Sequence, residues 1–269
     1  LNAEEFVTIA NEKFRNAGQP EQARLDDRGT NTDWQDVILR NGFVQNHALS
    51  LSGATETTNY FFSAGFLKNQ GPIVANDQTR YSFRGNFDHN VNKLVTVGAS
   101  LSYTRGTFNN LNTGGNALSG NVTGASRLLP NVSPYLDPTD PNFARFEGYN
   151  ITPDGAALGQ GANLRPVDNN FTNLAFVLAK NRYVTNNNRI IGNAYVQLNP
   201  LQGLAIKSQI ATDLLTQDDF QSLDPRHGDG RGSNGYVFQR FRPVTLWNWQ
   251  NTVSYNRRFN DVHDVNFVA

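Results

Sequence analysis

The segment from Gln78 to Arg105 constrains the fold of this chain more than any other. Its sequence, QTRYSFRGNFDHNVNKLVTVGASLSYTR, alternates apolar or small residues with polar residues on either side of a short turn at 91–94. Side chains of an extended strand point alternately to opposite faces, so the segment predicts a long amphipathic β-hairpin. Each predicted arm has about 11–13 residues, roughly twice the usual 5–6 of a strand in a soluble protein.

The length and the alternation of this hairpin are typical of strands that cross a membrane. Such a strand needs about 9–11 residues at a tilt of about 45°. In a membrane barrel, one face meets lipid and carries aromatic residues near the strand ends, while the other face lines a wet or plugged interior. The apolar face of the hairpin carries Tyr81, Phe83, Phe87 and Tyr103. A soluble sandwich also shows such alternation, so the hairpin favours a membrane barrel and leaves the sandwich open.

The rest of the chain repeats the pattern and adds a second signal, which is the length of the links between strands. Further strands are predicted at 43–53, 59–67, 188–198, 204–214 and 243–259, with a last one after 261. The links at 54–58, 91–94, 199–203 and 260–261 are short, and those at 68–77, 106–168 and 215–241 are longer. Because antiparallel neighbours place successive links at opposite ends, all tight turns fall on one side, as in outer-membrane barrels.

These observations divide the chain into two parts. Residues 1–42 are predicted to be an extracellular loop that contains a helix at 2–17, with Asn2 as N-cap and Glu5 at the third helical position. Residues 43–269 are predicted to be the wall segment, with long external loops at 106–168 and 215–241. The predicted fold class is all-β, an antiparallel transmembrane β-barrel segment of about eight strands with long extracellular loops and a short N-terminal helix.

Composition limits the classes of function. The 23 basic residues balance the 23 acidic ones, which argues against a nucleic-acid partner. No run approaches the roughly 18 apolar residues that a spanning helix needs. The chain has no cysteine, and its lack of methionine and of a signal peptide suggests a piece of a longer protein.

The sequence predicts no catalytic, cofactor-binding or metal site. His47, His89, His227 and His263 lie on separate predicted elements without the spacing of metal ligands, and no nucleophile lies beside a base. Four aromatic residues of the long loop are possible ligand or lid contacts, since their rings can stack on sugars or dock a partner: Tyr135, Phe143, Phe146 and Tyr149. The plainer interpretation is that these rings hold the loop together.

Several runs resemble the start of the barrel in TonB-dependent outer-membrane transporters of the SusC/RagA type. They are TDWQDVILRNGFVQNHALSLSGATETTNYFFSAGFLKNQGPI from Thr32, RYSFRGNFDHNVNKLVTVGASLSY from Arg80, LLPNVSPYLDP from Leu128 and NPLQGL from Asn199. The likeness covers nearly the whole chain and is specific as a set. The plug that fills such barrels, its TonB-contacting segment and the later strands do not match any part of the chain.

The resemblance implies a barrel of about 22 strands in the cell outer membrane. It also implies a SusD-like surface lipoprotein that lids the mouth, the TonB complex as energy source, outer-membrane lipid around the wall, and import of an oligosaccharide or peptide substrate. Two other hypotheses remain open at this point. One is a passive porin or surface adhesin on a similar barrel, and the other is a soluble carbohydrate-binding β-sandwich.

Overall fold

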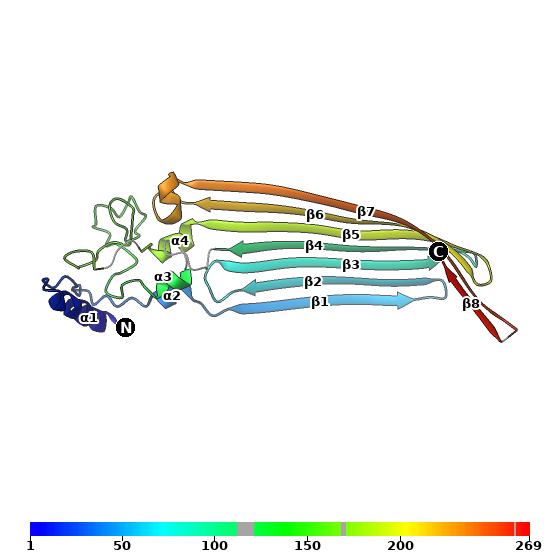
Figure 1. Ribbon diagram of the computed structural model, residues 1–269, viewed down its shortest axis with the longest axis horizontal. Coiled ribbons are helices and arrows are strands. Elements are labelled where there is room, and N and C mark those ends of the chain that lie inside the picture. Colours follow the sequence, from blue (N-terminus) through cyan, green and yellow to red (C-terminus); the bar gives the residue numbers. More distant parts are fainter. Residues whose placement is uncertain (112–120, 168–170, 261) are drawn as a thin grey trace.

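The eight strands form one antiparallel sheet in which each strand pairs with its neighbours in sequence, in the order β1 to β8 (Figure 1). The computed structural model describes residues 1–111, 121–167, 171–260 and 262–269. The strands are β1 Phe43–Ala54, β2 Thr58–Gln70, β3 Asn76–Asn90, β4 Val95–Asn110, β5 Arg182–Leu201, β6 Leu204–Leu223, β7 Tyr236–Phe259 and β8 His263–Val268. This sheet confirms the all-β antiparallel fold class and the predicted number of strands.

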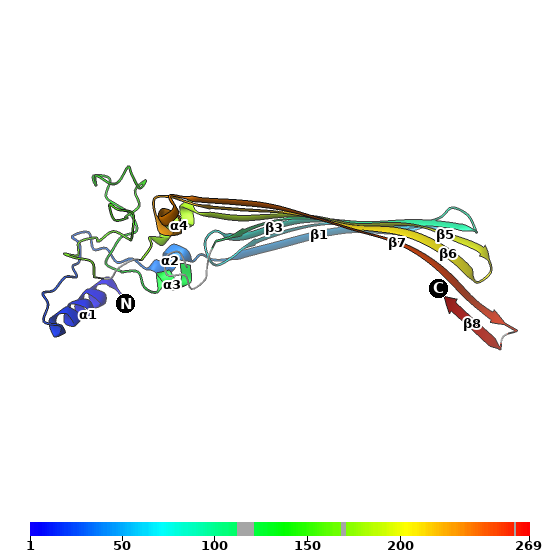
Figure 2. The same cartoon turned by 45° about the horizontal axis from the view of Figure 1, so that its top comes forward.

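The short and long links are segregated as predicted. The β1–β2, β3–β4, β5–β6 and β7–β8 links lie at one end of the sheet, and the helices and long links lie at the other (Figure 1). Figure 2 shows that the sheet is a single curved layer. The described strands all belong to this one sheet, so the second layer that a β-sandwich requires is not formed by this part of the chain.

Several strands extend further toward the long links than the sequence predicts, and the largest extensions are those of β4, β5, β6 and β7. Strand β6 continues to Leu223 and β7 begins at Tyr236, so most of the predicted loop 215–241 is strand and the true link is 224–235. The long link expected at 106–168 lies at 111–181 instead. These extensions mix polar and apolar residues on both faces and therefore lack a regular alternation, but their side chains pair across strands. Thr185 Oγ1 donates to Asp219 at 2.9 Å, and Arg240 Nη2 lies 2.9 Å from the same carboxylate.

One face of the sheet carries a band of mostly apolar side chains, which we call the apolar belt. The strand register brings Phe87, Ala99, Ala194, Ile210 and Trp249 side by side across five strands. The belt spans about nine residues of each central strand, close to the length that crosses a bilayer. Its members are Leu49, Leu51, Tyr60, Phe62, Ala64, Phe66, Tyr81, Phe83, Phe87, Val95, Val97, Ala99, Leu101, Tyr103, Ile190, Ala194, Val196, Leu198, Ile206, Ile210, Leu214, Trp247, Trp249, Val253 and Tyr255.

The apolar belt is not covered by any other part of the described chain. Ile210 is 57% exposed and Trp247 is 72% exposed, and none of the buried hydrophobic residues of the described chain lies in a strand. A soluble sheet would bury such a face, because about 25 cal/mol is gained for each Å² of apolar surface removed from water. The belt is therefore a surface that requires an apolar environment.

The opposite face of the sheet is polar, and its side chains bind each other. Tyr195 Oη donates to Asp88 Oδ1 at 2.6 Å, and Lys207 Nζ lies 4.0 Å from the centre of the Tyr195 ring. Tyr195 reaches Asp88 by lying across Gly98, where any Cβ would overlap its ring. On the same face, Arg189 and Asp213 form an ion pair with Nη2 and Oδ2 2.6 Å apart. This is the face predicted to line the interior.

Five helical segments lie at the long-link end of the sheet (Figures 1 and 2). They are α1 Ala3–Asn16, α2 Trp34–Ile38, α3 Asn121–Ala125, α4 Leu174–Lys180 and the 3₁₀ helix Gly228–Ser233. Helix α1 matches the helix predicted at 2–17, including the reciprocal hydrogen bonds between Asn2 and Glu5. Among the described residues, no helix has both the length and the apolar character to cross a membrane.

Candidate functional site

The candidate site is the cap of helices and long links at one end of the sheet, which we call the loop assembly. It consists of residues 1–42, the described parts of 111–181, and 224–235. The loop assembly, and not the sheet, contains the buried hydrophobic residues. One cluster joins Trp34 and Ile38 of α2 to Leu128, Val132 and Leu174, and a second joins Phe146, Ile151 and Phe176. These links are therefore packed as a small folded unit.

Buried asparagines tie the N-terminal segment to the rest of the loop assembly. The Asn11 side chain of α1 donates to Ala23 O at 3.0 Å and accepts from Ala23 N at 2.9 Å. Asn131 Nδ2 then donates to both Arg24 O and Asn163 Oδ1, at 2.8 and 2.7 Å. An amide side chain both donates and accepts, so it can satisfy an irregular backbone away from helices and strands.

The centre of the loop assembly is a contact between Asn173 and His227, both of which are fully buried. The Asn173 side chain caps α4 and also donates to Pro134 O and Asn150 O, at 2.8 and 3.0 Å. His227 Nε2 accepts from the Asn173 backbone N–H at 2.8 Å, and Nδ1 lies 2.8 Å from Gly155 O. Since a carbonyl oxygen only accepts, Nδ1 carries the proton and the ring is neutral.

A network of ion pairs lies next to the contact between Asn173 and His227. The Glu147 carboxylate binds Lys180 and Arg226, and Arg226 also binds Asp224 with Nη2 and Oδ2 2.8 Å apart. The bonds from Lys180 and Arg226 hold the pKa of Glu147 below its usual range. The guanidinium of Arg226 lies 5.4 Å from the centre of the Phe176 ring, whose edge meets His227. The network joins the 111–181 link to the 224–235 link.

A polar cleft of about 470 Å³ opens in the surface of the loop assembly. Its lining includes Asp26, Arg28, Asn131, Tyr135, Asp137 and Asp140. Arg28 Nη1 binds Asp137 Oδ2 at 3.0 Å. Hydrogen bonds from the side chain and backbone of Thr139 are the main cause of a lowered pKa at Asp137. Carboxylates, amides and one exposed aromatic ring are groups that can bind a polar ligand by hydrogen bonding and stacking.

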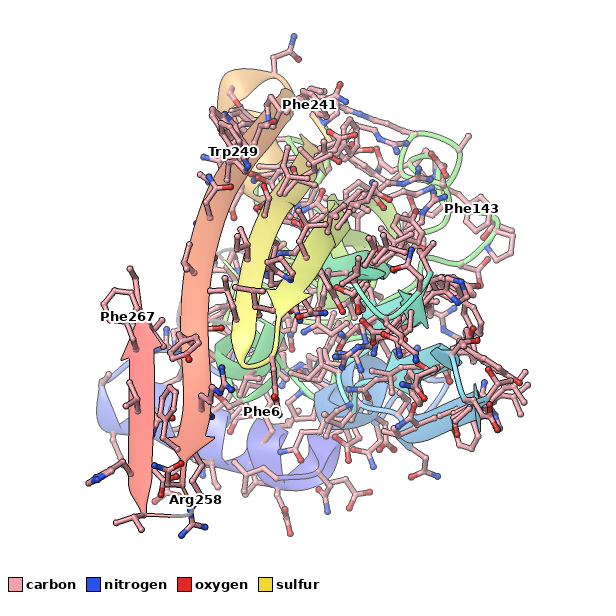
Figure 3. All side chains as sticks on the ribbon, turned by 90° about the vertical axis from the view of Figure 1, so that its right-hand side faces the viewer. Phe6, Phe143, Phe241, Trp249, Arg258 and Phe267 are labelled. Atoms are coloured by element: carbon pink, nitrogen blue, oxygen red, sulfur yellow. The ribbon has the colours of Figure 1, made fainter. Side chains whose placement is uncertain are left out.

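The four aromatic residues predicted as ligand or lid contacts differ in their exposure in the structure. Tyr135 is 55% exposed and lines the cleft, while the half-buried Tyr149 lies beside it with the ring centres 5.6 Å apart. Phe143 is half-buried and lies at the margin of the molecule in Figure 3. Phe146 is only 1% exposed and packs in a core cluster, so its ring has no surface for a ligand.

Sequence reasoning missed Asn131, Asn173 and His227. Their partners lie far away along the chain, for example 54 residues between Asn173 and His227. No local spacing signals such a contact. The described residues contain no cluster of three or more His, Cys, Asp or Glu that could hold a metal ion.

Because the imidazole of His227 is buried in its neutral form, we expect acidic pH to destabilise the loop assembly. Burial lowers the pKa of His227 below its ordinary value of 6.5, and Arg231 adds to this, whereas the hydrogen bond to Gly155, Asp224 and Asp154 oppose it. A group whose pKa is depressed by folding stabilises the fold above its unfolded pKa and loses that contribution as the pH falls through the folded value. Protection of amide hydrogens in 131–167, 171–181 and 224–235 should therefore be constant from pH 8 to about 7 and fall below about 6.5.

The matched variants are His227→Gln, which removes the buried titrating ring, and His263→Gln, which removes an exposed imidazole on β8. We expect His227→Gln to flatten the acid-dependent loss of protection and His263→Gln to leave it unchanged. An unaltered pH profile in His227→Gln would refute the role assigned to this ring.

The sheet and the loop assembly together define a class of protein. One curved antiparallel sheet, apolar on one face and polar on the other, with tight turns at one end and long structured links at the other, is the architecture of an arc of the wall of an outer-membrane β-barrel. No model of a protein family matches the chain. Comparisons with individual proteins are more specific.

The chain is similar to TonB-dependent receptors of Formosa agariphila. It is 24% identical to TonB-dependent receptor P26 over 237 residues, which is 87% of this chain and 21% of that protein. It is 27% identical to TonB-dependent receptor P3 over 139 residues, which is 50% of this chain and 13% of that protein. The chain thus spans between 13% and 21% of the length of these relatives.

Solved structures of one transporter share the fold. The RagAB peptide transporter matches 98% of this chain with a TM-score of 0.65 at 19% identity, over 28% of its own chain. The RagAB peptide importer in an open state matches 100% of this chain with a TM-score of 0.68 at 17% identity, over 31% of its own chain. The resemblance to TonB-dependent transporters of the SusC/RagA type is confirmed.

Proposed function

We propose that this chain forms part of the wall and the external loops of a TonB-dependent active transporter in the cell outer membrane. The complete barrel would have about 22 strands, of which this chain supplies eight. The observation that carries the proposal is the exposed apolar belt, about nine residues high, on a sheet whose other face is polar. In this proposal the belt meets outer-membrane lipid, and the polar face lines the interior.

The loop assembly then lies outside the cell, at the mouth of the barrel. The cleft beside Tyr135, and the half-buried ring of Phe143, are the surfaces through which it would contact the substrate or a SusD-like lipoprotein lid. The core clusters and the buried asparagines support this role, because they hold the cleft in a fixed shape. The cargo would be an oligosaccharide or a peptide, released inward when the TonB complex acts on the plug.

Energy coupling distinguishes this function from a passive porin. Cells that depend on the complete protein for uptake of a labelled oligosaccharide or peptide should lose uptake when a protonophore collapses the proton gradient. Diffusion through a porin needs no energy and would continue at its original rate. Uptake that survives the protonophore would overturn the assignment as an active transporter.

Substitution of Tyr135 and of Phe143 tests the candidate contacts. We expect Tyr135→Ala and Phe143→Ala each to reduce either substrate uptake or the amount of lipoprotein that co-purifies with the transporter by about 5- to 30-fold. This is the effect of losing one aromatic contact of about 1–2 kcal/mol. Phe241→Ala is a matched control, since Phe241 is 63% exposed but lies away from Phe143 (Figure 3). Equal effects of all three substitutions would remove Tyr135 and Phe143 from the candidate contacts.

A further inference from the structure

On β2, β3 and β4 the apolar belt ends abruptly on the side of the long links. Phe66, Tyr81 and Tyr103 are its last members on β2, β3 and β4, and the next residues on the same face are Lys68, Thr79 and Arg105. One step further on these three strands, the residues on this face are Gln70, Asp77 and Thr107, which are all polar. On β2 to β4, the edge of the belt is thus a sharp line between apolar and polar side chains.

Two basic residues lie on this line with two hydroxyl groups between them. Lys68 on β2 is paired with Thr79 on β3, and Tyr81 on β3 is paired with Arg105 on β4. All four side chains project from the same face, because each lies an even number of residues from a belt member of its strand. Lys68 and Arg105 are two strands apart, about 10 Å across and about 7 Å along the sheet. Their long side chains can therefore meet over Thr79 and Tyr81.

The charges of these two residues are not neutralised by the nearest acids on this face. Asp77 forms its ion pair with Arg40, and Asp218 accepts a hydrogen bond from Gln239 at 3.2 Å. Within the described chain, no ion pair or side-chain hydrogen bond involves Lys68 or Arg105. Arg105 is exposed, and Tyr81 is 53% exposed. Two cations and two hydroxyls at the edge of an apolar surface match a phosphate attached to a hydrocarbon chain.

We propose that Lys68 and Arg105, with the hydroxyls of Thr79 and Tyr81, bind the phosphate of a lipid headgroup in the outer leaflet. The proposal rests on the proposed function, since it requires that the belt meets lipid and that the long links lie outside. The acyl chains of the lipid would lie against Phe66, Phe83 and Leu101 of the belt, directly below the phosphate. Binding would fix the depth of the wall in the membrane at this edge.

The test uses the complete protein in neutral detergent and counts bound lipid by native mass spectrometry. The probes are lipid A with its phosphates and the same lipid A after their removal. Each basic residue near an anionic headgroup is worth about fivefold in affinity, so Lys68→Gln with Arg105→Gln should weaken binding of phosphorylated lipid A by about 25-fold. Binding of the dephosphorylated lipid should not change.

The control variant carries Lys93→Gln and Arg257→Gln, which remove two cations near the short-turn end of the sheet. This variant should bind phosphorylated lipid A like the unsubstituted protein. The proposal would be overturned if the Lys68→Gln, Arg105→Gln variant bound phosphorylated lipid A as well as the unsubstituted protein does, or if both variants lost the same amount of binding.

A nitroxide attached at Phe83→Cys shows whether a negative result concerns only the phosphate site or the proposed function as well. If it is accessible to oxygen, the belt meets lipid and only the phosphate site is wrong; if it is accessible to a water-soluble nickel chelate, the proposed function fails.

Discussion

Substitution of Ile210 by lysine is expected to destabilise the folded wall in a bilayer by about 2–4 kcal/mol. Ile210 lies at the middle of the apolar belt, between Ala194 and Trp249, and is 57% exposed. An ammonium group there must lie in hydrocarbon or distort the bilayer to reach water. The free energy of unfolding in lipid vesicles, measured by urea titration, gives the size of the effect.

The neighbouring residue supplies the control for this prediction. Gln209 projects from the polar face, where it is paired with Tyr195 and Gln250. Gln209→Lys is expected to change the free energy of unfolding by less than about 0.5–1 kcal/mol, because its side chain stays in water. If Ile210→Lys cost no more than Gln209→Lys, the apolar belt would not face lipid.

Replacement of Asn173 by alanine is expected to open the loop assembly while leaving the sheet intact. The substitution removes the cap of α4 and two hydrogen bonds to backbone carbonyls from a residue with no exposed surface. Loss of a cap costs about 1 kcal/mol and each buried hydrogen bond about 1 kcal/mol more, so the local opening free energy should fall by about 2–4 kcal/mol. Amide hydrogen exchange in 131–167, 171–181 and 224–235 measures this change.

Asn142→Ala is the control, since Asn142 is half-buried in the same link and lies at the margin of the cleft. Its effect on exchange should stay within about 0.5 kcal/mol. Exchange in β2 to β6 should be the same in both variants, because the sheet is held by its own ladder of hydrogen bonds. Unchanged exchange in Asn173→Ala would show that Asn173 does not hold the loops together.

The sequence predicts the sheet best where one face is apolar. The hairpin at Gln78–Arg105 corresponds to β3 and β4, and strand 188–198 lies within β5, because alternation is strong wherever the belt forms. Beyond the belt, apolar and polar residues no longer alternate regularly, and on β6 most of the residues are polar. Residues 215–223 therefore read as loop, although Asp219 and its neighbours are paired across strands.

The loop assembly was predictable only where the signal is local. Capping by Asn2 and Glu5 marks α1, whereas the short apolar run at 171–179 does not identify the helix α4, since such a run fits a strand or a helix. The exposure of Tyr135 and the burial of Phe146 could not be predicted, because they depend on packing against Ile151 and Phe176. The contact of His227 with Asn173 depends on the whole fold in the same way.

A scan of nitroxide labels along β5 tests the central claim most directly. Single cysteines would be placed at each position from Ile190 to Leu198 in the complete protein, reconstituted in lipid vesicles. The even-numbered positions belong to the belt face and should show high accessibility to oxygen, whereas the odd-numbered positions, from Ile191 to Gln197, should show less accessibility to oxygen and more to a water-soluble nickel chelate. Accessibility that does not alternate, or chelate access to both faces, would contradict a wall with lipid on one side and a polar interior on the other.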